Sequence, residues 1–99
     1  MKKIYENVYV IVRTEKAGVF AGNAIRRDGD ELLLHNARRI WYWDGARSLS
    51  QLAVDGTKEP KNCKFAMEVA SIELFGVIEI IPCTEKAEKS IKDVAVWKI

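Results

Sequence analysis

The first strand that the sequence predicts carries apolar side chains on both of its faces. In residues 8–14 (VYVIVRT), three valines fall on one face of a pleated strand, and Tyr9 and Ile11 fall on the other. β-Branched and aromatic residues of this kind are typical of strands. Because both faces are apolar, we expect this strand to be covered on both sides.

Glycine-containing turns divide the next residues into further strands. Gly22 lies inside one predicted strand, where glycine indicates a bend or a close approach of two backbones. The Asp28-Gly29 pair predicts a hairpin, because glycine adopts the positive φ of a tight turn. Asp44-Gly45 predicts another turn. The strands expected between the turns are residues 19–27, 31–35 and 38–43.

The second half of the chain mixes helices with strands. Ser48 is predicted to cap a short helix in which Leu49, Leu52 and Ala53 share one face and which ends at Gly56. The other expected elements are a polar loop at 55–62, strands at 64–69, 71–81 and 94–99, and a second helix at 85–92 capped by Thr84.

Short, consecutive strands favour a closed or rolled sheet, because closure removes exposed edges. We therefore predict a single domain over residues 1–99 that is mainly β within the α+β class. The expected architecture is a small SH3-like or Sm-like barrel, or a rolled antiparallel sheet, with two short helices. Residues 8–37 resemble the opening of an Sm-like barrel through their glycines at 18, 22 and 29.

The charge of the chain is weak overall and unevenly placed. Its 99 residues carry 16 Lys and Arg against 14 Asp and Glu, a net charge of +2. This balance argues against nucleic acid as a partner. Five of the six arginines nevertheless fall between Arg26 and Arg47, so the sequence leaves room for a local anion site.

Targeting and redox signals point to the cytosol. No apolar run approaches the ~18–20 residues that a membrane span needs, and no signal-peptide core follows Lys2 and Lys3. We expect a cytoplasmic protein without a membrane partner. Cys63 and Cys83 are then expected to be reduced thiols.

The sequence contains no motif of a known catalytic or metal centre. Its single histidine, His35, gives no Cys and His spacing of a zinc site, and no phosphate-binding glycine loop is present. No nucleophile or carboxylate lies at a motif spacing from His35, which favours a structural or surface role for it. We therefore predict no cofactor, no metal and no enzymatic activity.

The most distinctive stretch is residues 36–52 (NARRIWYWDGARSLSQL). On a strand, Arg39, Trp41 and Trp43 project from one face. Two indoles beside a guanidinium suit a stacked nucleobase and its phosphate. The ligand-binding residues predicted from this stretch are Arg38, Arg39, Trp41, Tyr42, Trp43, Gly45, Arg47 and Ser48.

A simpler interpretation of the same residues stays open. The tryptophans would form core or a subunit contact, and the arginines would cover them with their aliphatic stems. Trp, Tyr and Arg are also the residue types enriched in protein-interface hot spots. Composition does not separate a ligand site from a protein interface or a core.

Three segments give the chain a resemblance to a small protein family carried by phages and prophages. They are ARRIWYWDGARSLSQLAVDG (37–56), KNCKF (61–65) and IEIIPCTEKA (78–87). The family has no assigned activity, so the resemblance transfers no site residues. It implies a protein of about one hundred residues that acts in the cytosol of a bacterial host.

The function expected from these observations is binding without catalysis. By analogy with small phage proteins that inhibit host defences, the leading hypothesis is a homo-oligomeric sponge that sequesters a nucleotide immune signal. The second hypothesis is a protein-interaction module, or an inhibitor of a host defence protein, that uses the Trp and Arg stretch. The third is an Sm-like RNA-binding protein.

Overall fold

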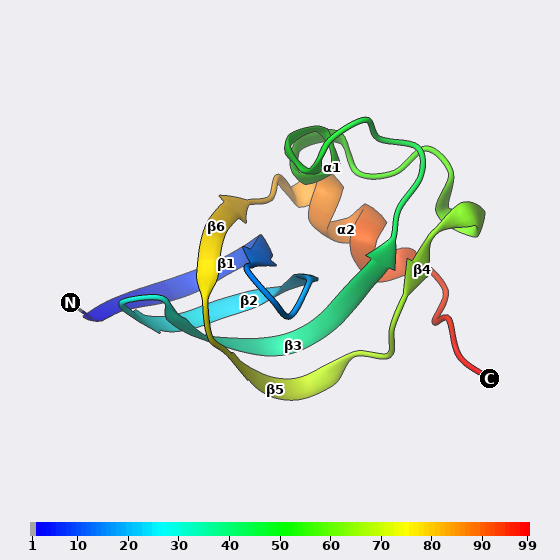
Figure 1. The fold of residues 1–99 in the computed structure, drawn as a ribbon. Helices are drawn as coiled ribbons and strands as arrows, with labels where there is room; N and C mark the ends of the chain where they lie inside the picture. The colour runs from blue at the N-terminus through cyan, green and yellow to red at the C-terminus, as the bar shows by residue number, and fades with distance from the viewer. Residues whose placement is uncertain (1) are drawn as a thin grey trace.

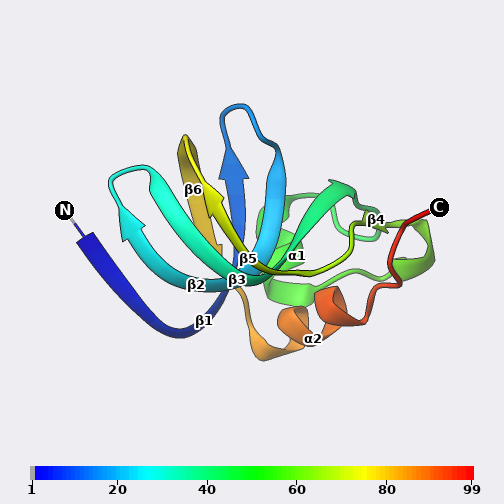
Figure 2. The ribbon, with the colours of Figure 1, turned by 90° about the horizontal axis from the view of Figure 1, so that it is seen from below.

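The computed structural model describes residues 2–99, which form an antiparallel sheet that rolls round on itself, with two helices packed together at one end (Figures 1 and 2). The strands are β1 (Lys2–Thr14), β2 (Val19–Asp28), β3 (Glu31–Tyr42), β4 (Lys64–Phe65), β5 (Val69–Leu74) and β6 (Val77–Pro82). The helices are α1 (Leu49–Asp55) and α2 (Glu85–Asp93), and a 3₁₀ turn covers Pro60–Asn62.

The long strand β3 gives the sheet its rolled shape. The strand order is β4-β3-β2-β1-β6, and β5 pairs with the first part of β3. A corner at Phe75 and Gly76 carries the chain from β5 to β6, which pairs with β1 on the opposite side of the meander (Figure 1). The prediction of a mainly β, rolled antiparallel sheet with two short helices is confirmed.

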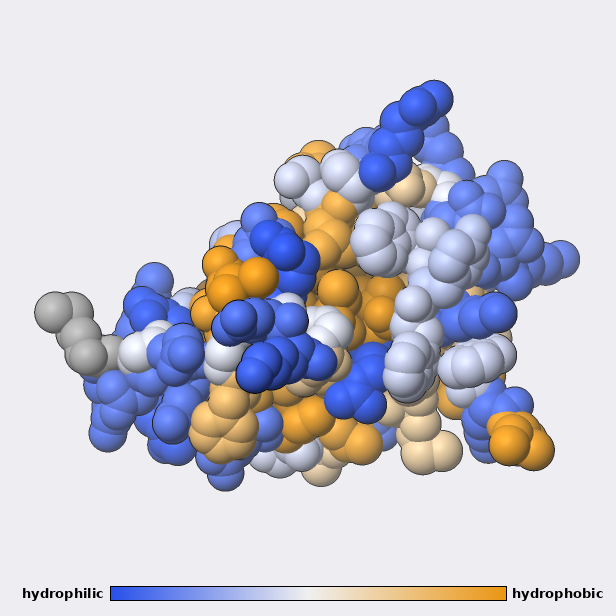
Figure 3. All heavy atoms as spheres, viewed as in Figure 1, coloured by the Kyte–Doolittle hydropathy of each residue, from blue (hydrophilic) through white to orange (hydrophobic). Residues whose placement is uncertain are grey.

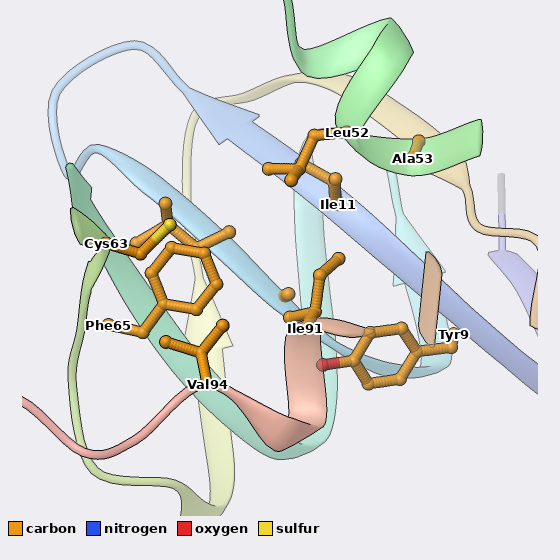
Figure 4. Close-up of a cluster of buried hydrophobic side chains, with 10 residues drawn as sticks. Tyr9, Ile11, Leu52, Ala53, Cys63, Phe65, Ile91 and Val94 are labelled. Carbon is orange, nitrogen blue, oxygen red and sulfur yellow. The ribbon is translucent and has the colours of Figure 1, made fainter. Parts of the chain in front are cut away.

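Residues 9–12 of β1 are buried on both faces of the sheet, as the apolar side chains on both faces predict. Val10 and Val12 pack into one cluster with Phe20 and Leu34, which we call the roll core. On the opposite face, Tyr9 and Ile11 contribute to a second cluster with residues of both helices, which we call the helix-side core (Figure 4). Two separate cores therefore share one central strand.

Both helices begin where the sequence predicts. The Ser48 hydroxyl accepts a hydrogen bond from the Gln51 amide, and the Thr84 hydroxyl accepts one from the Ala87 amide. Each bond satisfies an amide that the first helical turn leaves without a partner. The Thr84 hydroxyl also donates to the carbonyl of Val54 at 2.7 Å, so this one side chain joins the two helices.

One strand replaces the two predicted at residues 31–35 and 38–43. Asn36 adopts a φ of +51° and forms a bulge in β3, which continues through it. The extra residue reverses the alternation of side chains. As a result Ala37 joins the roll core beyond Leu34, and Arg38 turns toward the helix-side core.

The predictions for three other strands need correction. Residues 71–81 are divided by the corner at Phe75 and Gly76, and the strand predicted at 64–69 is limited to β4. Residues 94–99 form a single bridge, between Val96 and Phe65, and no strand. Because β4 is only two residues long, the C-terminal segment has too few backbone partners there to form a strand.

The close backbone approach predicted at Gly22 is confirmed. A Cβ atom at this position would lie 3.0 Å from both the His35 carbonyl oxygen and the Ala37 Cα atom. Real Cβ atoms rarely approach other atoms so closely, so any larger residue would push β2 and β3 apart beside the Asn36 bulge.

We expect Tyr9→Phe to stabilise the protein. The Tyr9 hydroxyl lies buried in the helix-side core and has no hydrogen-bond partner among the described residues (Figure 4). An unpaired buried polar group costs roughly 1–3 kcal/mol, so its removal should raise the free energy of unfolding by about 1 kcal/mol. Urea unfolding of both proteins measures the change, and a lower value for Tyr9→Phe would contradict this assignment.

Stability should fall at alkaline pH through Cys83. Burial, with a smaller effect of Glu88, raises the pKa of this thiol from an ordinary 9.0 to about 12. As the pH rises through this range the unfolded chain binds fewer protons than the folded one, and the free energy of unfolding decreases. Urea unfolding at pH values on either side of 9 should show a smaller decrease for Cys83→Ala. An equal decrease in both proteins would refute the role of the thiol.

Candidate aromatic and cationic site

Arg38 is an internal structural residue and is not available to a ligand. Only 4% of it is exposed. Its guanidinium donates to the carbonyl oxygens of Ala66 at 2.9 Å, Ile91 at 3.1 Å, Val94 at 2.9 Å and Phe65 at 3.2 Å. Burial lowers the pKa of Arg38, and Tyr9 and Glu68 oppose this shift. The prediction that Arg38 holds phosphate therefore does not fit its position.

Arg39 lies on the opposite face of β3 from Arg38, and its guanidinium is not occupied by backbone carbonyls. Its guanidinium carbon is 4.6 Å from the centre of the Phe20 ring and 5.7 Å from that of Trp41. The Nε atom is buried and has no hydrogen-bond partner among residues 2–99. Within the same residues no carboxylate forms an ion pair with this guanidinium. Arg39 is therefore a half-buried cation held by aromatic rings.

The exposed side chain of Trp41 lies beside the Arg39 guanidinium. It is 61% exposed, and its ring meets that of Trp97 edge to face at a centroid distance of 6.4 Å. The Lys64 ammonium lies 5.5 Å from the centre of the Trp97 ring. We call the group formed by Arg39, Trp41, Lys64 and Trp97 the tryptophan surface.

The C-terminal segment carries Trp97 to this surface. The Trp97 amide donates to the Phe65 carbonyl at 2.9 Å, and the adjacent Val96 bridges to Phe65. On the β3 side, the backbone amide of Ala66 donates a hydrogen bond to the backbone carbonyl of Arg39. The short strand β4 thus lies between the two tryptophans and fixes their separation.

Trp43 does not share the surface of Trp41, contrary to the alternation predicted for residues 38–43. Strand β3 ends at Tyr42, and the half-buried Trp43 packs against the helix-side core. Alternation of side chains holds only while the backbone stays extended. Tyr42 is 51% exposed, but its ring makes no aromatic contact with another described residue.

The remaining predicted residues, Gly45, Arg47 and Ser48, lie near the start of α1, away from the tryptophan surface. Gly45 and Arg47 line a shallow cleft of about 400 Å³, together with Asp44, Lys58 and Glu59. The Gly45 amide donates to the Asp44 carboxylate. The Ser48 hydroxyl accepts from the amide of Gln51 as the cap of α1. The fold therefore already uses the donor predicted at Gly45 and the oxygen predicted at Ser48.

Sequence reasoning missed Trp97 and Lys64. Both are distant in the chain from residues 36–52, and the expected strand at 94–99 treated Trp97 as one member of an alternation. The one available signal was the third tryptophan itself, because so large an apolar side chain gains energy by packing against a partner.

The fold and this surface together define a small, mainly β protein with an exposed aromatic and cationic surface. The chain belongs to the family described as a domain of unknown function, DUF6948, whose model matches residues 7–91. Comparison with curated proteins gives no match, and comparison with solved structures gives none either.

Three further features complete the description of the candidate chemistry. Across residues 2–99, no three His, Cys, Asp or Glu side chains gather closely enough to hold a metal ion. None of the helices described is both long enough and apolar enough to span a membrane. Cys63 is buried, Cys83 is half-buried, and both are free thiols.

Arg38→Lys should destabilise the protein strongly. A lysine keeps the charge, but its single ammonium lacks the planar fork that serves four carbonyls at once. We expect the free energy of unfolding to fall by about 3 kcal/mol, because buried acceptors lose charged donors. Urea unfolding measures this, with Arg39→Lys as the matched control that should change much less. Similar values for the two variants would contradict the structural role of Arg38.

Proposed function

We propose that this protein is a non-enzymatic binding protein whose tryptophan surface holds a planar, phosphate-bearing ligand such as a nucleotide. The observation that carries the proposal is Arg39, a guanidinium between aromatic rings whose buried Nε has no hydrogen-bond partner among the described residues. The terminal nitrogens of the same guanidinium form no hydrogen bond or ion pair with a described residue either, so they can donate to an incoming acceptor.

The neighbours of Arg39 suit the two parts of such a ligand. Trp41 offers an exposed indole on which a base can stack, a contact worth about 1–3 kcal/mol. Lys64 supplies a second cation next to Trp97 for a phosphate oxygen. The exposure of Trp41 and Trp97, 61% and 50%, favours stacking over enclosure.

The biological role that we attach to this binding is sequestration. A homo-oligomer that acts in the cytosol of a bacterial host and removes a nucleotide immune signal needs binding sites and no chemistry. The support for this role is the resemblance of residues 37–56, 61–65 and 78–87 to a phage-borne family, combined with the chemistry of the tryptophan surface.

A contact with another protein is the second candidate, and the extent of exposed apolar surface favours it. Tyr42 and Met67 are 51% and 56% exposed, and Val96 is 44% exposed beside Trp97. Figure 3 shows apolar surface in the middle of one face, between charged side chains. Exposed apolar groups of this kind mark interaction sites on small proteins. An RNA-binding role is weaker, because the net charge is only +2.

Arg39→Ala should weaken nucleotide binding by roughly 10- to 100-fold, the value of one or two charge-assisted hydrogen bonds. The melting temperature should change little, because Arg39 donates no hydrogen bond to another described residue. Native mass spectrometry with cyclic mononucleotides, cyclic dinucleotides and ATP would identify a ligand and the oligomeric state, and titration calorimetry would measure its affinity.

Arg47→Ala is the matched control, because it removes an arginine from the separate cleft near α1. Equal losses in the two variants would contradict the site. Failure of the whole nucleotide panel to bind would overturn the nucleotide proposal. Disruption of an oligomer by Trp41→Ala, without any nucleotide bound, would favour the protein-contact function instead.

A further inference from the structure

A second candidate site lies between the meander and α2. It is a cleft of about 430 Å³, within the range of small-molecule sites, and it is separate from the tryptophan surface. Strands β1, β2 and β3 form one side, and α2 forms the other. We call it the polar cleft, and its lining residues are Asn7, Asn23, Ala24, Ile25, His35, Asn36, Glu88 and Lys92.

Two unusual backbone conformations meet at this cleft. Asn7 has a φ of +54° and Asn36 a φ of +51°, and they are the non-glycine residues with positive φ in the described chain. Each lies at a register shift, one where β1 pairs with β2 and one where β2 pairs with β3. Bulges redirect side chains and are common beside functional sites.

The strand between the bulges adds a third asparagine. Asn23 on β2 pairs with Tyr9 on one side and with His35 on the other. Two independent irregularities thus bring three side-chain amides and an imidazole to one cleft. No hydrogen bond joins the side chains of Asn7, Asn23, His35 or Asn36 to any other described residue, so their donors and acceptors face solvent.

The charges in the polar cleft cancel. Lys92 lies beside Glu88 one helical turn earlier, with 2.5 Å between the ammonium and a carboxylate oxygen. The same ammonium lies 5.0 Å from the centre of the Tyr9 ring. The cation is therefore already paired, and an incoming phosphate would meet the Glu88 carboxylate. A neutral ligand avoids this repulsion.

We propose that the polar cleft binds a neutral polyhydroxylated ligand, a carbohydrate of one or two sugar units. A side-chain amide both donates and accepts, so it matches the paired donor and acceptor of a sugar hydroxyl. Three such amides in one cleft provide this pattern repeatedly, and the half-buried Ile25 provides an apolar contact for a sugar ring. The site is independent of the proposed nucleotide site.

The test is a titration with D-glucose, D-ribose and N-acetylglucosamine, followed by ¹H–¹⁵N correlation spectra of the side-chain amides. At least one sugar should shift the amide signals of Asn7, Asn23 and Asn36 in a saturable way. The Asn62 amide is an internal control, because it donates to Asp44 outside the cleft and should stay in place. Inorganic phosphate serves as the anionic comparison.

Asn36→Gly separates a binding role from a structural one. Glycine accepts the positive φ without strain, so the bulge and the melting temperature should be preserved while the amide is lost. We expect affinity for the responding sugar to fall about fivefold or more, the value of one or two hydrogen bonds. Asn62→Ala should leave that affinity unchanged.

Three results would overturn the proposal. The first is that no sugar moves the three amide signals. The second is that phosphate moves them as strongly as the sugars do. The third is that Asn36→Gly binds the responding sugar as tightly as the natural chain, which would mean that the positive φ at Asn36 serves the bulge alone.

Discussion

The guanidinium of Arg38 is the interaction on which the rest of the structure depends. Arg38 lies on β3, and its guanidinium donates to carbonyls of β4 and the residue after it, of the end of α2, and of the residue that follows α2. None of these segments has a long strand pairing of its own: β4 contains two residues and the C-terminal segment makes one bridge. A single charged side chain therefore replaces the ladder that regular strands would provide.

The candidate ligand surface follows from this arrangement. Arg38 holds the backbone of Phe65 and Ala66, and the same two residues bond to Trp97 and to Arg39. The bulge at Asn36 decides which of the two consecutive arginines is internal, because it reverses the alternation of β3. One residue inserted in a strand thus produces both the internal support and the outward-facing cation.

The features that were predicted correctly depend on near neighbours. The caps at Ser48 and Thr84, the hairpin at Asp28-Gly29 and the two apolar faces of β1 are determined within a few residues. The features that were missed join distant positions. The carbonyl partners of Arg38 lie 27 to 56 residues away along the chain, and Trp41 meets a tryptophan at the other end of the sequence. No local pattern marks such pairs, and an Asn in the middle of β3 signals a break as readily as a bulge.

The pairing of β1 with β6 has a consequence for the order in which the chain acquires its structure. Val10 pairs with Pro82, so the roll joins positions from opposite ends of the sequence. Contacts of such high sequence separation slow folding, since the entropy of closing a long loop is lost before the contact forms. On the ribosome, β1, β2 and β3 emerge first and can pair as hairpins, while the outer edge of β1 stays without its neighbour until β6 has been synthesised. Completion of the roll is thereby a late event, and the apolar residues of β1 stay open to other contacts until it occurs.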